Sequence, residues 1–375
     1  MPKQTSSREV ALRTDTPAAQ GFRMPAEWEL HSATWIAWPH NPEDWPGKFE
    51  PIPWVYAEIV RHLAAGEKVN ILVDDAAQKE AARKVLRQAH VNTSQVRFYI
   101  QSTDRVWTRD SGAIFVTKTA TKTGATKPGK LGATLWRFNA WAKYSDWTKD
   151  QHVNALMAAA TGAEAWQPMT RGGKRQTRVV LEGGSIDVNG QGTILTTEEC
   201  LLSKKQQRNP GVTRAQYEKG FAEYLGASHV IWLKNGIVGD DTHGHVDDMA
   251  RFVTANTVLI AAEKNKRDEN YNLLRENLER LRTARLENGR RLKVKTLPMP
   301  APVVFQGQRL PASYANFYIA NQTVLVPTFN DPNDRVALNL LAELFPRRKV
   351  VGIHCGDFIW GLGAIHCMTQ QQPAI

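Results

Sequence analysis

The chain is poor in cysteine and has no long apolar run. Three of its 375 residues are cysteine, at positions 200, 355 and 367. A sparse, odd count is atypical of a disulfide framework and favours a reducing compartment, so we expect a cytoplasmic protein. No apolar stretch approaches the ~20 residues of a membrane span, and residues 1–20 lack the apolar centre of a secretory signal. We therefore expect no membrane partner and a flexible N-terminal tail over residues 1–22.

A linker rich in proline, glycine and serine is also missing. The content of 42% hydrophobic and 23% charged residues is that of a globular protein. We therefore predict one domain over residues 23–375. The stretch from Thr117 to Lys130 has four lysines and no acidic residue, and it predicts a basic insertion at about 117–133.

Acidic residues are fewer than basic ones, which leaves a formal net charge of +11. Such an excess is compatible with a nucleic-acid-binding protein. Much of it falls in the insertion and in the stretch 171–178, however, and not on one amphipathic face. A solvated basic surface is the preferred interpretation. We expect no nucleic-acid partner and keep nucleic-acid binding as a remote alternative.

Predicted strands and helices alternate along the chain, which indicates an α/β fold. Units of two strands, a helix and a strand recur at a spacing of roughly 70 residues, as in a propeller-like or repeated α/β architecture. The predicted strands span 33–39, 69–73, 96–100, 113–116, 192–197, 230–233, 250–253, 257–261, 292–297, 316–320, 323–326 and 349–353. The predicted helices span 55–63, 76–89, 214–225, 267–286 and 336–344.

One cysteine lies in an unusual setting. Cys367 follows the glycine-containing run Gly361-Leu362-Gly363 and precedes Thr369-Gln370-Gln371. Glycines let the backbone approach a ligand closely, and a thiol beside them can reach that ligand. Cys367 is therefore a candidate nucleophile, although an inert buried cysteine is the commoner case.

Two acidic motifs supply partners for such a thiol. Asp104 and Asp110 flank Trp107 between two strand-like segments, and Glu182 stands before two glycines. A carboxylate in such a position can accept two parallel hydrogen bonds from a planar guanidinium. Trp107 can pack on an alkyl stem or a cation. Each motif alone is also compatible with an ordinary turn.

The segment 240–248 contains two histidines and four aspartates. His245 and Asp247 are two residues apart, so in an extended segment they project from the same face as an acid/base and an anchor. His243, His245 and Asp247 also resemble the His-x-His-x-Asp run of zinc hydrolases. That pattern is usually completed by a histidine directly after the aspartate, where Asp248 stands here. A zinc-dependent hydrolase is kept as a remote alternative.

Taken together in this order, the motifs resemble the agmatine deiminases, which group with the Porphyromonas-type peptidylarginine deiminases in the guanidino-group-modifying superfamily. The resemblance implies the pentein α/β propeller, in which five ββαβ units surround a pseudo-fivefold axis with the active site in the central channel. It also implies hydrolysis of a guanidinium to a ureido group with loss of ammonia, without metal or cofactor. The stretches that carry it are 24–29, 34–39, 106–112, 138–141, 181–185, 196–202, 244–248, 314–318 and 365–371.

The resemblance also implies roles for individual residues. Cys367 matches the nucleophile and His245 the general acid/base. Asp110 and Asp247 match the carboxylates that hold the guanidinium, and Glu182 matches a supporting acid. The expected substrate-binding residues are Trp107, Asp104, Asn316 and Gly363.

The implied reaction converts agmatine to N-carbamoylputrescine and ammonia through a covalent cysteine thiouronium, a step of polyamine biosynthesis. The expected partner is thus a small cationic guanidine, and a homodimer is one assembly the sequence leaves open. Leu362 and Ala364 interrupt the family's longer glycine run, and His243 stands where an acidic residue is common. Because both departures concern the pocket, deimination of peptidylarginine or another guanidine remains the alternative.

Overall fold

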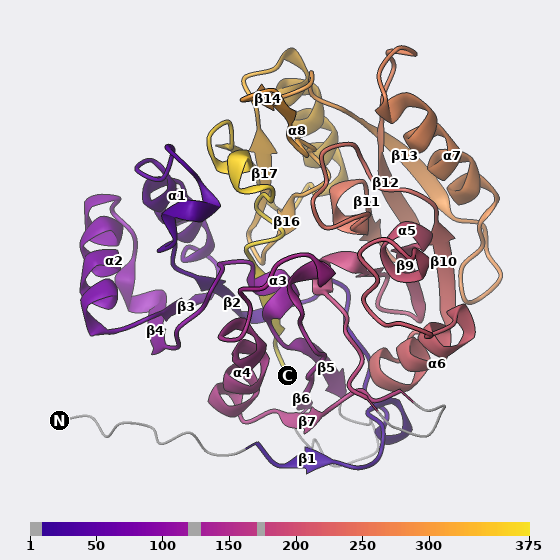
Figure 1. The fold of residues 1–375 in the computed structure, drawn as a ribbon, viewed down its shortest axis with the longest axis horizontal. Coiled ribbons are helices and arrows are strands. Elements are labelled where there is room, and N and C mark those ends of the chain that lie inside the picture. The colour runs from indigo at the N-terminus through magenta and orange to yellow at the C-terminus, as the bar shows by residue number, and fades with distance from the viewer. Residues whose placement is uncertain (1–9, 119–128, 171–176) are drawn as a thin grey trace.

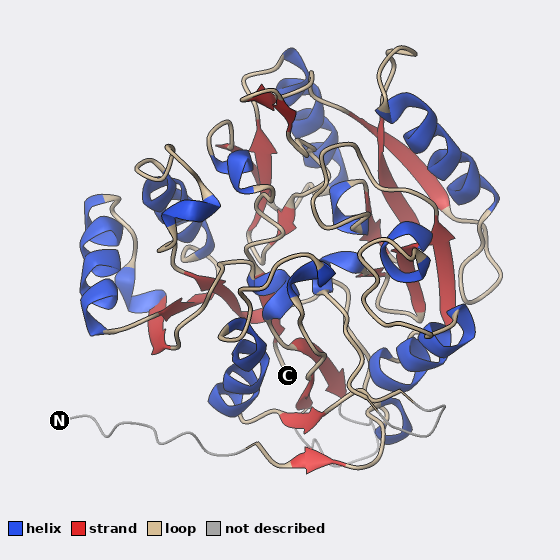
Figure 2. Cartoon of the chain, in the orientation of Figure 1, coloured by secondary structure: helices blue, strands red, loops and turns tan. Residues whose placement is uncertain are grey.

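The computed structural model describes residues 10–118, 129–170 and 177–375, which form an α/β fold. Most of the long helices lie at the periphery and the strands lie further inward (Figure 1, Figure 2). The α/β class predicted from the sequence is confirmed. Residues 119–128 of the predicted basic insertion lie outside the described residues, and the strands on either side of them pair as an antiparallel hairpin.

The described strands form five mixed sheets and one small hairpin. In each mixed sheet an antiparallel pair is extended by a strand that runs parallel to its neighbour. Two sheets have four strands, which are, in spatial order, β1 (Leu12–Arg13), β7 (Glu164–Trp166), β6 (Lys130–Thr134) and β5 (Ile114–Lys118) in one, and β19 (Gln370–Pro373), β2 (His31–Ala37), β3 (Lys68–Val73) and β4 (Val96–Ile100) in the other. Three sheets have three strands, which are β10 (His229–Leu233), β9 (Thr193–Thr197) and β8 (Asp187–Val188); β11 (Ala250–Thr254), β12 (Thr257–Ala262) and β13 (Lys293–Pro298); and β16 (Tyr318–Ile319), β17 (Thr323–Thr328) and β18 (Lys349–His354). The hairpin joins β14 (Val304–Phe305) and β15 (Gln308–Arg309).

Helices connect the parallel strands, as parallel pairing requires a crossover. The helix α6 has the bounds that the sequence predicts, because Thr213 and Gln216 form a capping box at its start and Gly226 takes the left-handed conformation at its end. The crossover helices are α1 (Ile52–Leu63), α2 (Ala76–Gln88), α4 (Val153–Thr161), α5 (Glu198–Leu202), α6 (Arg214–Leu225), α7 (Asn270–Thr283) and α8 (Pro332–Leu344).

Some elements differ from the prediction. The helix expected over 336–344 begins at Pro332, because Asp331 caps it and proline suits the first helical position. The strand expected over 316–320 is reduced to Tyr318–Ile319, since the Asn316 side chain bonds to His366 and Cys367. The helix α4 and the strand β19 were not predicted. β19 is a buried polar strand, and Gln370 donates from its side chain to the Ala113 carbonyl over 2.9 Å.

The predicted tail comprises residues 1–22, of which residues 1–9 lie outside the described residues. The described remainder contacts the body of the protein. β1 pairs with β7, Arg13 forms an ion pair with Glu164 at 2.9 Å, and the indole nitrogen of Trp166 donates to Asp15 over 3.0 Å.

Short helices between the sheets carry Asp110 and Asp247 and directly follow Glu182 and His245. The helix α3 (Thr108–Ser111) lies near the middle of the view in Figure 1 and contacts the 3₁₀ helix η6 (Gly183–Ser185), which contacts η7 (Val246–Asp248). The largest apolar cluster reaches from α1 and β2 to Ile365, Cys367 and Met368, so it anchors the cysteine segment. The remaining 3₁₀ helices are η1 (Ala18–Gln20), η2 (Pro42–Asp44), η3 (Thr93–Gln95), η4 (Ala140–Ala142), η5 (Asp150–His152) and η8 (Phe358–Gly361).

No helix among the described residues is both long enough and apolar enough to cross a membrane.

Candidate active site

A cavity of about 200 Å³ leads to the candidate nucleophile. Its buried lining includes Cys367, Asp110 and Trp107, and its exposed lining includes Glu43 and Gln308. The buried residues therefore mark the inner end of the cavity and the exposed ones its outer end. The full lining is Glu43, Asp44, Pro46, Arg105, Trp107, Asp110, Trp141, Tyr144, Asp241, Thr242, Gln308, Trp360, Gly361, Leu362, Gly363 and Cys367.

The Cys367 side chain is held in place by Asn316. The amide nitrogen of Asn316 donates to the cysteine sulfur over 3.1 Å, and its oxygen accepts from the backbone N–H of His366 over 2.9 Å. The Cys367 carbonyl accepts from the backbone N–H of Arg109 over 3.1 Å. The turn that carries the thiol is thus tied both to Asn316 and to α3.

Gly363 lies where a side chain does not fit. A Cβ atom built on Gly363 would be 2.8 Å from the ring of Trp107, closer than any real Cβ contact. The turn before Cys367 therefore packs directly on Trp107, one of the predicted substrate-binding residues. Leu362 precedes it with a positive φ of 66°, a conformation that side chains rarely adopt.

His245 is completely buried among carboxylates. Its Nε2 lies 3.8 Å from Oε2 of Glu182, and its Nδ1 lies 3.9 Å from Oδ2 of Asp110 and 4.0 Å from Oδ1 of Asp247. Within the described residues neither ring nitrogen has a hydrogen-bond partner. Burial lowers the pKa of His245, but the charge of Asp110 and the neighbouring Cys200 and Glu182 raise it well above its usual value. The geometry thus favours a charged imidazolium.

The two predicted guanidinium-binding carboxylates are held differently. Asp110 accepts from the Trp141 indole over 2.9 Å and from the backbone N–H of Gly184 over 3.0 Å. Burial raises the pKa of Asp110 to about 6. Oδ2 of Asp247 accepts from Nδ1 of His366 over 2.6 Å, whereas its Oδ1 has no hydrogen-bond partner among the described residues.

Glu182 forms a buried ion pair with Arg208. The Arg208 Nε donates to Oε1 of Glu182 over 3.1 Å, and both side chains are fully buried. Burial raises the pKa of Glu182, but Arg208 and His245 together lower it by more than burial raises it, so that the pKa is about 2. Glu182 is therefore a fixed negative charge beside His245.

Gly184 lies at the point where the histidine and the two aspartates meet. A Cβ atom there would be 2.6 Å from Nδ1 of His245 and 3.0 Å from both Oδ1 of Asp110 and Oδ2 of Asp247. The Glu-Gly-Gly motif thus supplies a carboxylate and, two residues later, a backbone without a side chain. This close approach brings the three polar groups together.

Cys367 carries a thiol that resists ionisation. Burial, followed by the charges of Asp247, Asp248 and Asp110, raises the pKa of Cys367 well above its usual value. Oδ2 of Asp247 lies 3.9 Å from the sulfur. A cation bound between these carboxylates would offset their charge and favour the thiolate, which is the nucleophilic form.

Two predicted residues do not join this group. Oδ2 of Asp104 accepts from the backbone N–H of Lys149 over 2.8 Å, and its Oδ1 lies 3.6 Å from the Lys149 ammonium group, so Asp104 faces Lys149. His243 faces Glu199, at 3.6 Å, and Ser203, at 3.2 Å. His243 is thus turned away from Asp247, and the three side chains of the His-x-His-x-Asp run do not converge on one metal position.

The sequence analysis missed four groups that support the site: Glu27, Arg208, His366 and Cys200. Glu27 and His366 lie within the stretches that carry the family resemblance, but nothing in the sequence shows that they meet. Cys200 lies close to Glu182 and His245, with one potential ligand atom from each within 4.8 Å of the others. Asp247, Asp248 and Cys367 form a second such group. Both groups consist of the side chains described above, and we identify neither as a metal centre.

The fold and this thiol site define a class of α/β protein in which a buried cysteine lies close to a buried histidine and several carboxyl groups. Residues 23–373 match the Porphyromonas-type peptidyl-arginine deiminase family, and the chain belongs to that family.

Relatives of known name cover nearly the whole chain. The agmatine deiminase of Pseudomonas aeruginosa (strain LESB58) is 35% identical over 384 residues, which cover 96% of this chain and 98% of the relative. The structure of an agmatine deiminase of Enterococcus faecalis superposes with a TM-score of 0.86 at 31% identity and covers 97% of this chain and 100% of its own. A variant of the C. jejuni agmatine deiminase with substrate bound gives a TM-score of 0.79 at 28% identity, covering 94% of this chain and 96% of its own.

Proposed function

We propose that the protein is an agmatine deiminase, which hydrolyses agmatine to N-carbamoylputrescine and ammonia. The observation that carries this proposal is that Cys367 and Asp110 line the inner end of the cavity, while His245 and Asp247 meet Asp110 at Gly184 and Oδ2 of Asp247 lies 3.9 Å from the sulfur. Family membership and the agmatine deiminases among its relatives support it. Agmatine is a small cation, and the carboxyl groups of Asp110 and Asp247 lie near the thiol.

In this proposal Asp110 and Asp247 bind the guanidinium through its N–H groups. Oδ1 of Asp247 has no partner among the described residues, and each oxygen of Asp110 has one partner and a second lone pair. Held in this way, the guanidinium carbon faces the sulfur, so the reaction becomes intramolecular. The bound positive charge also favours loss of the Cys367 proton to solvent.

The thiolate of Cys367 then attacks the guanidinium carbon, and a C–S bond forms as the C=N π electrons move to nitrogen. His245, which is charged in the free protein, donates its proton to the leaving terminal nitrogen. The C–N bond breaks, ammonia departs, and a covalent thiouronium remains on the sulfur.

Neutral His245 then takes a proton from water as the water oxygen attacks the thiouronium carbon. The C–S bond breaks and its electrons return to sulfur. The oxygen then loses its remaining proton to solvent, which leaves a ureido group. Glu182 stabilises the imidazolium at both stages, because its charge lies 3.8 Å from Nε2. Asp104 has no part in this scheme, whereas Trp107, Gly363 and Asn316 position the substrate chain and the thiol.

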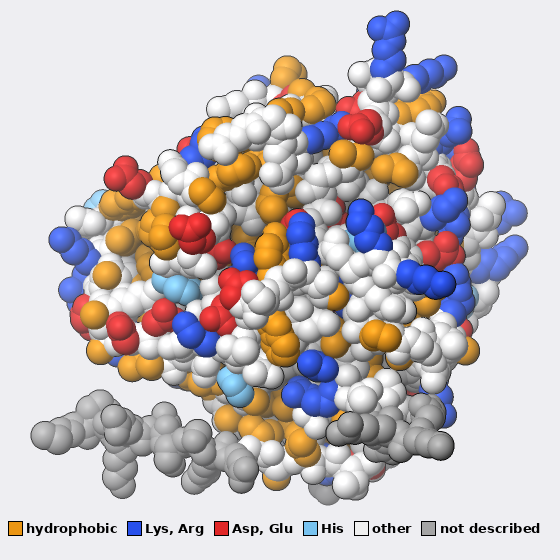
Figure 3. Space-filling view, in the orientation of Figure 1, with side chains coloured by type: hydrophobic (Ala, Val, Ile, Leu, Met, Phe, Trp, Pro, Cys, Tyr) orange, Lys and Arg blue, Asp and Glu red, His pale blue; other side chains and the backbone are white. Residues whose placement is uncertain are grey.

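The outer cavity favours a substrate whose far end is cationic. Three of its lining residues are Glu43, Asp44 and Asp241. Asp44 forms an ion pair with Arg105 and Asp241 with Lys143, which leaves the carboxyl group of Glu43 in excess. The carboxylate of free arginine would meet these acids, whereas the ammonium group of agmatine would not be repelled. Lys, Arg, Asp and Glu side chains are interspersed over the face seen in Figure 3, with several Asp and Glu left of its centre.

The proposal also includes the symmetric arrangement of the sheets. Five sheets share one pattern of antiparallel and parallel pairing, which supports five ββαβ units about a pseudo-fivefold axis. We assign them to one catalytic domain over residues 23–375.

The test is ammonia release from purified, EDTA-treated protein offered agmatine, free arginine and a peptide with internal arginine in parallel. We expect release from agmatine alone. Release mainly from the peptide would transfer the protein to peptidylarginine deimination. Activity that appears only with added zinc would overturn the metal-free mechanism, and salt-dependent nucleic-acid binding without ammonia release would overturn the enzyme assignment.

A further inference from the structure

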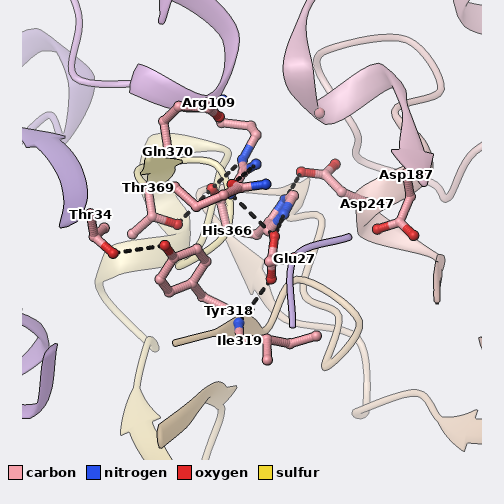
Figure 4. A network of polar contacts seen from close by, with 12 residues as sticks. Glu27, Thr34, Arg109, Asp187, Asp247, Tyr318, Ile319, His366, Thr369 and Gln370 are labelled. Atoms are coloured by element: carbon pink, nitrogen blue, oxygen red, sulfur yellow. Dashed lines mark hydrogen bonds and ion pairs between the residues drawn. The ribbon is translucent and has the colours of Figure 1, made fainter. Parts of the chain in front are cut away.

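The residue before the nucleophile, His366, is buried between two carboxylates. Its Nδ1 lies 2.6 Å from Oδ2 of Asp247, and its Nε2 lies 2.7 Å from Oε2 of Glu27 (Figure 4). A neutral imidazole has one N–H and one lone pair, so it would point a lone pair at one carboxylate. Only the doubly protonated ring donates to both.

The charges around His366 favour the same form. Three carboxyl groups, those of Glu27, Asp187 and Asp247, are joined by two guanidinium groups, those of Arg109 and Arg251. A charged His366 pairs with two of these carboxyl groups, and the charged His245 lies 4.0 Å from Oδ1 of Asp247 on its other side. Contact with two carboxylates favours the charged form of a buried histidine.

Both carboxylates beside His366 are held in their charged forms. Burial raises the pKa of Glu27, but Arg251, His366 and Arg109 lower it well below its usual value. Burial likewise raises the pKa of Asp247, but His366, followed by His245 and Arg251, lowers it below its usual value. At neutral pH we therefore expect neither carboxyl group to carry the proton that lies between it and the His366 ring.

Asp247 is fixed on one side and free on the other. Its Oδ2 is bound to His366, whereas its Oδ1 has no partner among the described residues and lies 4.0 Å from Nδ1 of His245. The His366 backbone is fixed as well, because its N–H donates to Asn316 and its carbonyl accepts from Nε of Arg109. His366 thus joins the nucleophile turn to the orientation of Asp247.

We propose that His366 is a positioning residue that remains doubly protonated between Glu27 and Asp247 and turns Asp247 so that its Oδ1 binds the substrate guanidinium. The second part rests on the proposed function. The protonation state of His366 does not, and it is measured separately.

The protonation state is tested by NMR of full-length protein labelled with ¹⁵N in its histidine rings. The chain has ten histidines, and His366 is identified as the signal that is lost in the His366→Gln variant. We expect the His366 signal to show a proton on both ring nitrogens at the pH of the activity assay, because each nitrogen lies within hydrogen-bond distance of a carboxylate oxygen. A ring with a single N–H would overturn the proposal whether or not the protein hydrolyses agmatine.

The positioning role is tested with two amide variants. The side chain of His366→Asn places its nitrogen near the former Nδ1 and can still donate to Asp247, whereas His366→Gln reaches toward Glu27 and leaves Asp247 unheld. We expect kcat/KM for agmatine to fall about 100-fold in His366→Gln, the cost of a misplaced binding group, and about tenfold in His366→Asn. In both variants the acidic limb of the kcat/KM profile should move to higher pH, because Asp247 loses a neighbouring cation.

Glu27→Gln provides a variant that keeps the contact between His366 and Asp247. Because His366 can still donate from Nδ1 to Asp247 in this variant, kcat/KM should fall less than in His366→Gln. His354→Asn is the matched control, because His354 also precedes a cysteine but is exposed at the end of β18. Equal losses in both His366 variants with an unchanged pH profile would show that His366 only fills space.

Discussion

The side-chain nitrogen of Asn316 lies 3.1 Å from the sulfur of Cys367 and 2.9 Å from Oδ1 of Asp248. One amide group thus separates the thiol from a carboxyl group. Burial, followed by Asp247 and Asp240, raises the pKa of Asp248 well above its usual value, which reduces its negative charge beside the sulfur. An N–H donor stabilises a thiolate, so Asn316 opposes the surrounding acids.

Replacing Asn316 with aspartate should make the thiolate harder to form. Asn316→Asp removes the donor and places a further carboxyl group beside the sulfur, which should raise the pKa of Cys367. We expect alkylation of the protein by iodoacetamide at pH 7 to slow at least about tenfold, the effect of one pKa unit on the thiolate fraction. Asn265→Asp, in an exposed turn, is the control and should react like the wild type. An unchanged alkylation rate in Asn316→Asp would contradict the role of the amide.

The two buried cysteines near the C-terminus should differ in function. Cys367→Ser should lower kcat for agmatine at least about 1000-fold, because it removes the nucleophile. Calorimetric binding of agmatine should persist, since Asp110 and Asp247 are unchanged. Cys355→Ala is the comparison, because Cys355 is equally buried but does not line the cavity. Its folded fraction should retain wild-type kcat, and comparable turnover by Cys367→Ser would refute the assignment.

Much of this site could be predicted from short motifs, because each motif places its residue at a strand end or in a tight turn. Asp110, Glu182, His245 and Asp247 were selected as candidates in this way. In the structure Asp110, His245 and Asp247 meet at Gly184, and Glu182 lies 3.8 Å from His245. The sequence could not separate Asp104 from Asp110. Both flank Trp107, and only the path of the loop turns Asp104 toward Lys149.

The residues that support the site could not be predicted, because each acts across a long sequence separation. Glu27 meets His366 from 339 residues away, and Arg208 meets Glu182 from 26 residues away. Hydrophobic periodicity carries no information about such polar contacts. The same limit explains why β19 was missed, since its buried face contains glutamine.

Agmatine hydrolysis should depend on the ionisation of Asp110. Burial raises the pKa of Asp110 to about 6, so its carboxyl group is protonated below that pH and cannot pair with a guanidinium. We expect kcat/KM to rise between pH 5 and 7 with a midpoint at about pH 6. The bound cation lowers the pKa of Asp110, so the midpoint for kcat should lie at lower pH than that for kcat/KM.

Parallel profiles of kcat and kcat/KM for the wild type and Asp110→Asn check this dependence. The variant should bind agmatine weakly and lose the midpoint near pH 6. A wild-type kcat/KM that is constant from pH 5 to 7 would show that Asp110 is already ionised in the free protein.

A single methyl group at Gly184 should disable the site with little effect on the rest of the fold. In Gly184→Ala the new Cβ would lie 2.6 Å from Nδ1 of His245 and 3.0 Å from Oδ1 of Asp110, so these side chains must move. Overpacking of this kind costs about 1–3 kcal/mol of stability, while a displacement of about 1 Å in the catalytic groups costs about 100-fold in rate. We therefore expect kcat/KM to fall at least about 100-fold in a protein that still unfolds cooperatively.

Gly220→Ala separates this effect from a general intolerance of added side chains. Gly220 lies inside α6, and the nearest atom to a Cβ there is in the Trp136 ring at 4.0 Å. Alanine in a helix interior is more stable than glycine by about 1 kcal/mol, so the melting temperature should rise slightly with activity unchanged. If Gly184→Ala retained wild-type kcat/KM in the same assay, His245 and the aspartates would not need the close approach that this glycine provides.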